Sequence, residues 1–118
     1  MKFTESLKKT CQFRAVYGGG RSCADRFLVL YALENHTDTN KLGISVSRKV
    51  GKSVTRSRVT RLIREVYRLT EESITPGCDL VFIARAPAGG AAFDEIRRSV
   101  CSLLKRQRLL STEGCGNG

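Results

Sequence analysis

Lysine and arginine are concentrated in residues 48–68, a stretch that contains a single acidic residue, Glu65. A guanidinium group matches two phosphate oxygens in bidentate geometry. At about 100° per residue, Arg61, Arg64 and Arg68 fall on one side of a helix, together with Ser57. The stretch therefore predicts a phosphate-binding helical surface. Its candidate binding residues are Arg48, Lys49, Lys52, Arg56, Ser57, Arg58, Arg61, Arg64 and Arg68.

The same stretch carries an apolar stripe that must position the charges. Val59, Leu62, Ile63 and Val66 recur at i, i+3, i+4 and i+7, the spacing of an amphipathic helix. We expect the helix to run from an N-cap at Ser53 to about residue 72, with its positive dipole end adding to the charge. The sequence at 51–53, Gly-Lys-Ser, resembles the end of a nucleotide-binding P-loop. Position 46 is valine where that motif requires glycine, which excludes it.

Composition restricts the class of partner. The 118 residues suit one domain, and the net charge of +10 with a pI near 9.9 predicts attraction to a polyanion. No apolar run approaches the roughly 18 residues that span a bilayer, and the N-terminus lacks a signal-peptide core. Tryptophan is absent, and no apolar wedge accompanies the basic helix. We therefore expect a cytoplasmic protein that binds nucleic acid and not membrane.

Groups for conventional catalysis are missing from the sequence. The five cysteines include no Cys-x-x-Cys pair, and the single histidine, His36, lies in a turn-like segment. Clustered ligands at short spacing would be needed for zinc, and a nucleophile with a neighbouring base or paired carboxylates for hydrolysis. We predict neither a catalytic side chain nor a metal site in the protein.

The rest of the chain predicts an α+β domain over residues 1–110, with a flexible tail at 111–118. The expected architecture is a single-layer mixed sheet of three to four strands packed with helices, in the order α-β-β(-β)-α-β-α. Periodicity predicts strands at 27–33, 42–48 and 79–86, and helices at 10–17 and 92–110, with a loop at 86–90.

Aromatic residues form a second candidate feature. Phe13 and Tyr17 are one helical turn apart, and Tyr31 lies in the first expected strand. Rings beside a basic surface suit single-stranded nucleic acid, because bases stack on them while the backbone follows the charge. Packing in the core explains the same spacing equally well. Ser45 and Ser47 lie on the small, polar face of the second strand, which could face solvent or form the floor of a binding site.

Residues 48–65, Arg-Lys-Val-Gly-Lys-Ser-Val-Thr-Arg-Ser-Arg-Val-Thr-Arg-Leu-Ile-Arg-Glu, resemble the signature helix of the bacterial ribonuclease P protein family. The similarity extends in order over about residues 7–110. It includes Leu-Lys-Lys-x-x-x-Phe-x-x-Val-Tyr at 7–17, Phe-x-Val-Leu-Tyr at 27–31, Gly-Ile-Ser-Val-Ser-Arg-Lys-Val-Gly at 43–51 and Asp-Leu-Val-Phe-Ile-Ala-Arg-Ala-Pro at 79–87.

This resemblance implies an accessory protein subunit that joins a catalytic RNA subunit in removing the 5′ leader from precursor tRNA and broadens the range of substrates. It implies Mg²⁺ held mainly by the RNA, no organic cofactor and no required protein partner. The basic helix would face the RNA subunit. A cleft with Phe13, Tyr17 and Tyr31, and with Ser45 and Ser47 in its floor, would take the single-stranded leader. A left-handed βαβ crossover is also implied.

The sequence departs from the family pattern at two positions. Ser57 stands where the family usually has asparagine, and Thr60 where it often has a basic residue. A non-enzymatic ribosomal or RNA-assembly protein remains the alternative at this point, since it would use the same basic helix. Helix-turn-helix binding to duplex DNA is weaker, because no short helix is expected just before the basic one.

Overall fold

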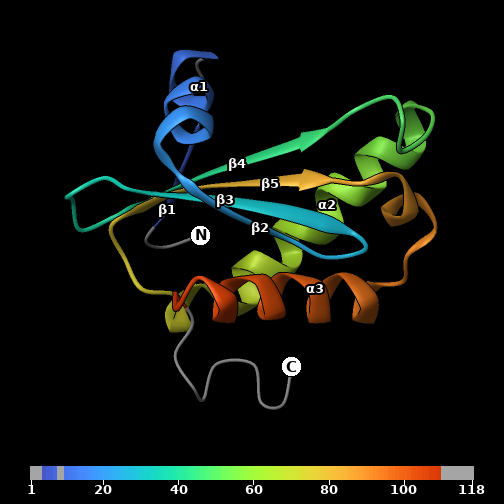
Figure 1. The fold of residues 1–118 in the computed structure, drawn as a ribbon. Helices are drawn as coiled ribbons and strands as arrows, with labels where there is room; N and C mark the ends of the chain where they lie inside the picture. The colour runs from blue at the N-terminus through green and yellow to red at the C-terminus, as the bar shows by residue number, and fades with distance from the viewer. Residues whose placement is uncertain (1–3, 8–9, 110–118) are drawn as a thin grey trace.

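A computed structural model describes residues 4–7 and 10–109, so the expected tail at 111–118 lies outside the described residues. Three helices and five strands occur in the described part: β1 (Thr4–Ser6), α1 (Thr10–Gly19), β2 (Arg21–Ala24), β3 (Leu28–Glu34), β4 (Asn40–Val46), α2 (Ser53–Thr70), β5 (Cys78–Ala84) and α3 (Phe93–Arg106). The strands form one sheet, with α1 on one face and α2 and α3 on the other (Figure 1). The α+β class is confirmed.

The sheet is mixed, in the order β1-β4-β5-β3-β2. β5 lies at its centre, parallel to β4 and antiparallel to β3. This agrees with its sequence, because a strand covered on both faces is apolar on both faces. The two edge strands β1 and β2 extend the expected three to four strands to five within the described residues. Both are short, so neither has the alternating pattern that identifies a strand from sequence.

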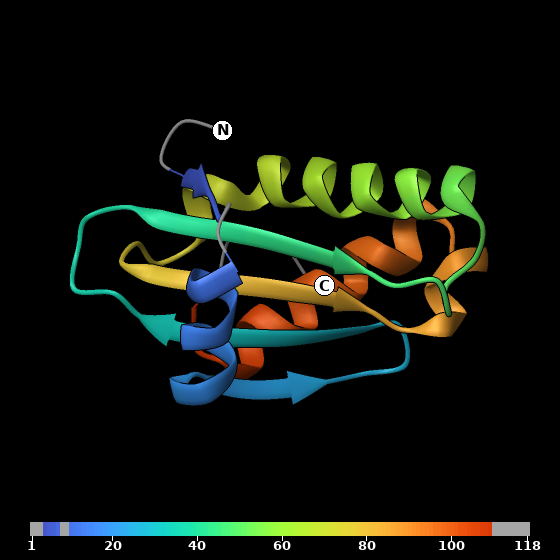
Figure 2. The same cartoon turned by 90° about the horizontal axis from the view of Figure 1, so that it is seen from above.

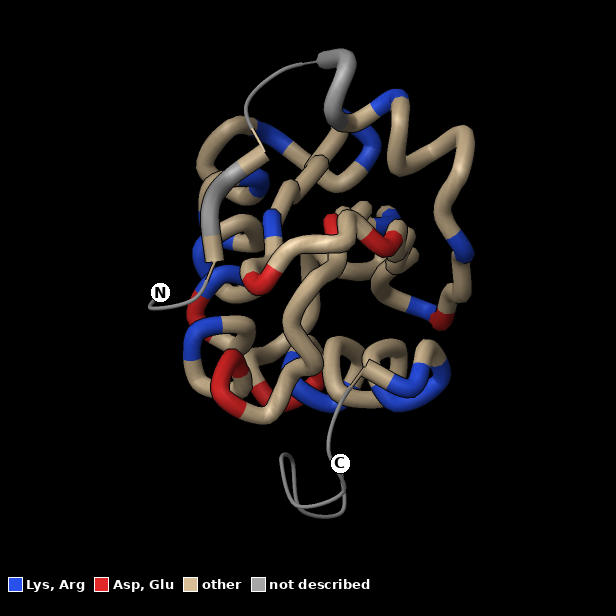
Figure 3. Tube along the Cα trace, turned by 90° about the vertical axis from the view of Figure 1, so that its left-hand side faces the viewer, with Lys and Arg blue, Asp and Glu red and all other residues tan. Residues whose placement is uncertain are grey.

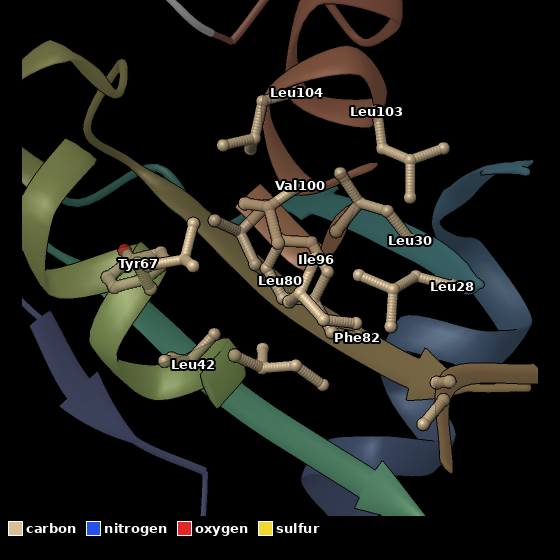
Figure 4. Close-up of a cluster of buried hydrophobic side chains, with 14 of the residues drawn as sticks. Leu28, Leu30, Leu42, Tyr67, Leu80, Phe82, Ile96, Val100, Leu103 and Leu104 are labelled. Carbon is tan, nitrogen blue, oxygen red and sulfur yellow. The ribbon is translucent and has the colours of Figure 1, made fainter. Parts of the chain in front are cut away.

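The main core lies between the sheet and the two lower helices (Figure 4). Val59, Ile63 and Val66 of α2 are fully buried, as their spacing predicts, and Leu62 is half-buried against the same cluster. Full burial of such a side chain contributes on the order of 1.5–3 kcal/mol. The sheet and α3 contribute Leu28, Leu30, Leu80, Phe82, Ile96, Val100, Leu103 and Leu104. Burial of the apolar stripe fixes which side of α2 faces outward.

The connection from β4 through α2 to β5 is left-handed. Figure 2 views the sheet from the side of α1, with the parallel strands β4 and β5 pointing to the right and β4 above β5. When the picture is rotated so that these strands point upward, β4 lies to the left of β5. The chain leaves β4, passes behind the sheet through α2 and returns on the right. Right-handed connections occur in about 98% of such units, so the general rule alone would have given the wrong hand. The hand implied by the family resemblance is the one observed.

Several element boundaries differ from the sequence expectations. Lys52, not Ser53, occupies the N-cap of α2, and no side chain caps that end. The expected loop at residues 86–90 forms a 3-10 turn. α3 ends at Arg106, earlier than expected, and its start is secured by Glu95, whose carboxylate accepts the backbone N–H of Ala92 at 2.9 Å. α1 continues two residues past Tyr17, to Gly19.

Candidate nucleic-acid interface

The outward side of α2 carries the basic residues that the sequence places there. Ser57, Arg61, Arg64 and Arg68 are exposed, opposite the buried Val59 and its partners. Figure 3 shows the basic residues of α2 along one side of the molecule, on the left of that view. The helix therefore presents an array of guanidinium groups on a face fixed by core packing.

A groove of about 470 Å³ lies between α2 and β4. Ile44 and Val46 form its strand wall, and its helix wall consists of Ser53, Arg56, Ser57, Thr60, Arg61 and Arg64. β1 pairs only with residues 40–42, which leaves the later half of β4 at the sheet edge beside the groove. The Nε of Arg56 is buried without a hydrogen-bond partner among the described residues. The groove therefore has a basic wall on the helix and an apolar wall on the strand.

The arginines of α2 differ in how far their side chains are already engaged. Arg58 donates from Nη2 to the carbonyl of Ala91 at 2.7 Å and from Nη1 to that of Gly89 at 3.4 Å. Arg68 donates from Nε to Glu65 at 2.6 Å and from Nη2 to the same carboxylate at 3.2 Å, which lowers the pKa of Glu65.

Arg61 and Arg64 have no hydrogen-bond or ion-pair partner within residues 4–7 and 10–109. Both line the β4 groove and a second depression that includes Arg68. These two guanidinium groups are the ones most available to an external phosphate.

Three further basic residues precede α2. Arg48, Lys49 and Lys52 are exposed on the segment that leads from β4 into the helix. The turn is held by the N–H of Val50, which donates to the carbonyl of Ser47 at 3.1 Å. These charges lie at the positive end of the α2 dipole, where an anion is favoured.

An aromatic cluster lies on the opposite face of the sheet. The rings of Tyr17 and Tyr31 meet edge to face at 5.1 Å, and those of Phe13 and Tyr17 are 6.3 Å apart. Tyr17 is 40% exposed, whereas Phe13 and Tyr31 are half-buried against a small core around Val16. The three predicted residues thus come together; Phe13 and Tyr31 also pack against the core, and Tyr17 is the most exposed of the three.

Ser45 of β4 joins this cluster through a hydrogen bond with the Tyr17 hydroxyl. Burial raises the pKa of Tyr17, and the bond to Ser45 partly opposes that shift. Ser47 lies past the end of β4, on the exposed turn, and the structure does not bring it to the rings.

Gly43 is a residue that sequence reasoning missed. A Cβ atom there would lie 2.6 Å from Cε1 of Phe13 and 3.1 Å from Cδ1 of Leu7. The Phe13 ring can therefore lie against the sheet only because position 43 has no side chain. Glycine in the middle of a strand signals close approach of another group, although not which group.

The described residues contain no group of three or more His, Cys, Asp or Glu side chains that could hold a metal ion. In the same part of the chain, no helix has the length and apolar character to cross a bilayer.

The fold and these two surfaces define a small, basic α+β RNA-binding protein. The family model for ribonuclease P matches residues 1–108. The chain belongs to the ribonuclease P protein family, the protein subunit of an endoribonuclease that matures the 5′ end of tRNA.

Known members are similar in both sequence and structure. The ribonuclease P protein component of Clostridioides difficile (strain 630) is 52% identical over 104 residues, covering 87% of this chain and 91% of that protein. The solved RNase P protein of Staphylococcus aureus is 34% identical, with a TM-score of 0.83 and coverage of 90% of this chain and 97% of that one. The Thermotoga maritima RNase P protein is 31% identical, with a TM-score of 0.79 and coverage of 86% and 96%.

Proposed function

We propose that the two surfaces divide the work of RNA binding. The basic face of α2 docks the catalytic RNA subunit, and the aromatic face of the sheet holds the single-stranded 5′ leader of precursor tRNA. The observation that carries this proposal is the separation of the surfaces: α2 lies on one face of the sheet and α1 on the other (Figure 1), and α1 carries Phe13 and Tyr17, the second of which meets the Tyr31 ring. Each surface also has the chemistry that its partner requires.

At the RNA subunit, Arg61 and Arg64 grip the backbone. Their guanidinium groups are exposed and lack partners among the described residues, so binding a phosphate breaks no internal ion pair. Lys52 and the basic residues of the preceding turn extend the contact toward the helix N-terminus. Arg58 strengthens the local potential while its own hydrogen bonds hold α2 to the segment before α3. Ser57, in the β4 groove, offers a hydroxyl to the same backbone.

At the leader, bases stack on the rings of Tyr17 and Tyr31 and on the edge of Phe13. Stacking on an aromatic ring contributes about 1–3 kcal/mol per base and tolerates any base, because every base has a π face. Tyr17 is the principal platform, since it is the most exposed of the three and its hydroxyl is held by Ser45. Binding energy from the leader adds to that from the tRNA body, which broadens the range of substrates that the holoenzyme accepts.

Chemistry remains with the RNA subunit. Mg²⁺ prefers oxygen ligands in octahedral geometry, and the described residues do not fit it, because their carboxylates do not converge into a donor set. We place Mg²⁺ mainly on the RNA, and assign the protein no organic cofactor, no membrane contact and no required protein partner. The cytoplasm is its expected location.

A cleavage assay tests this division. Precursor tRNA is incubated at low Mg²⁺ with the cognate RNA subunit alone, with this protein alone, and with both. Cleavage that is restored only when both are present is expected, with a larger effect for a leader of several nucleotides than for a single nucleotide. Cleavage by RNA-free protein, or an equal effect on the two leaders, would refute the proposal.

A further inference from the structure

A second basic groove lies outside both surfaces described above. It has a volume of about 340 Å³ and runs between α3 and the turn that joins β2 to β3. Its walls include Arg26 and Phe27 from the turn, and Arg98, Ser102 and Arg106 from one stripe of α3. β2 is an edge strand, at the opposite side of the sheet from β4 and its groove (Figure 2).

Two acidic residues also line this groove, but internal hydrogen bonds occupy their carboxylates. Asp25 accepts the backbone N–H groups of Phe27 and Leu28 on Oδ1, each at 2.9 Å, and the hydroxyl of Ser99 on Oδ2 at 2.6 Å. Glu95 caps the start of α3. Both carboxylates are thus used to hold the turn and the helix.

The arginines of the groove are less engaged. Arg98 is exposed and has no hydrogen-bond or ion-pair partner in the described part of the chain. Arg26 is exposed, and its guanidinium carbon lies 5.4 Å from the centre of the Phe27 ring, a cation–π contact that leaves the N–H groups available. Arg106 donates from one Nη to the carbonyl of Ala24 at 2.7 Å, which fixes it against the turn. The neighbouring Arg97, in contrast, faces Asp94 at 3.7 Å.

From this arrangement we infer that the α3 groove is a second contact for the phosphate backbone of the RNA subunit, separate from the α2 face. The inference rests on the proposed docking of that RNA on α2. Charge complementarity selects a polyanion, because three arginines line the groove against two carboxylates, and those carboxylates are directed to the turn and to the start of α3 by their hydrogen bonds. The position selects the RNA subunit over the leader, since α2 and α3 lie on one face of the sheet and α1, which carries Phe13 and Tyr17, lies on the other (Figure 1). The two contacts lie toward opposite edges of the sheet, on the same face, and together they fix the protein's orientation on the RNA.

The test compares two adjacent arginines of α3 by titrating the RNA subunit with the full-length protein at several salt concentrations. Arg98→Ala and Arg97→Ala change the net charge equally, but only Arg98 lines the groove. Arg98→Ala, and more strongly the Arg26→Ala/Arg98→Ala pair, should weaken binding by about three- to tenfold and reduce the salt slope by roughly 0.7–0.9 per lost contact. Arg97→Ala should have little effect, and Arg98→Lys should restore part of the loss.

Each other outcome also decides the matter. If Arg97→Ala and Arg98→Ala weaken RNA binding equally, the loss reflects net charge and not a contact in the groove, and the inference is overturned. The same variants are also assembled into holoenzyme and titrated with leader-bearing tRNA. A loss confined to that ligand would assign the groove to the substrate and also overturn the inference. If Arg61→Ala/Arg64→Ala weakens binding and the groove variants do not, this inference fails while the proposed function stands. If neither pair has an effect, both fail. The circular dichroism spectrum and thermal midpoint of each variant confirm folding, which we expect to be intact because Arg26 and Arg98 are exposed.

Discussion

Replacing Arg61 and Arg64 together by alanine isolates the phosphate-binding role of α2. Both side chains are exposed, and neither has a hydrogen-bond or ion-pair partner among the described residues. Alanine is the best helix former, so the helix and its buried face should remain intact. Any change in RNA affinity then reflects lost contacts with RNA and not a disturbed fold.

The expected magnitude follows from counterion release. Each neutralised phosphate contributes about 0.9 to the slope of log K against log salt for a duplex and about 0.7 for a single strand. Two lost contacts therefore reduce the slope by roughly 1.4–1.8. Between 50 and 200 mM salt, a fourfold change, the affinity of the unaltered protein should fall by about seven- to twelvefold more than that of the variant.

The assay is a titration of labelled RNA subunit at four or more salt concentrations in that range, without substrate. Arg14→Ala/Arg97→Ala provides a control with the same net charge, because Arg14 is exposed on α1 and Arg97 lies on α3. The control should keep the original slope. An unchanged slope in Arg61→Ala/Arg64→Ala, or the same reduction in both double variants, would refute specific phosphate contacts by α2.

Four further substitutions test leader binding and core packing. Tyr17→Ala and Phe13→Ala should each weaken the binding of leader-bearing tRNA to the holoenzyme by about 1–3 kcal/mol per lost stack. The binding of mature tRNA should change little. Equal losses for both ligands would assign the rings to packing. Gly43→Ala should lower the free energy of unfolding by about 1–3 kcal/mol, because the added methyl overlaps the Phe13 ring, and should impair leader binding in the same holoenzyme assay. Ile63→Ala should cost about 2–5 kcal/mol in urea denaturation, since Ile63 is fully buried; a smaller cost would show that α2 is held by other contacts.

Strong local periodicity made much of the fold predictable. The buried stripe of α2 and the apolar faces of β3 and β5 are properties of short, continuous segments, and the structure has them where the pattern predicts. Boundaries depend on finer effects, and the expected cap at Ser53 was wrong by one residue. β1 was missed because three residues carry no period, and its pairing with β4 joins segments far apart in the sequence.

The candidate site was predictable as a set of residues but not as a set of interactions. Arg58 and Arg61 look equivalent in the sequence, yet only Arg58 reaches the carbonyl of Ala91, which lies 33 residues further along the chain. Whether a guanidinium group is free depends on which segment packs beside it, and spacing within one helix contains no such information. For the same reason, the glycine that accommodates Phe13 could not be identified, because the two residues meet only after α1 packs on β4.

β4 connects the two proposed binding surfaces directly. Ile44 and Val46 line the groove with α2, while Gly43 and Ser45 contact the rings on the other face. Successive side chains of a strand point to opposite faces, so the two sets alternate along four consecutive residues. The leader and the RNA subunit would then be positioned across the thickness of one strand, with no flexible linker between their sites. Because β4 is paired with β5 through six residues, this spacing is set by the register of the sheet. A shift of one residue in that register would move both sets of contacts to the wrong face at once.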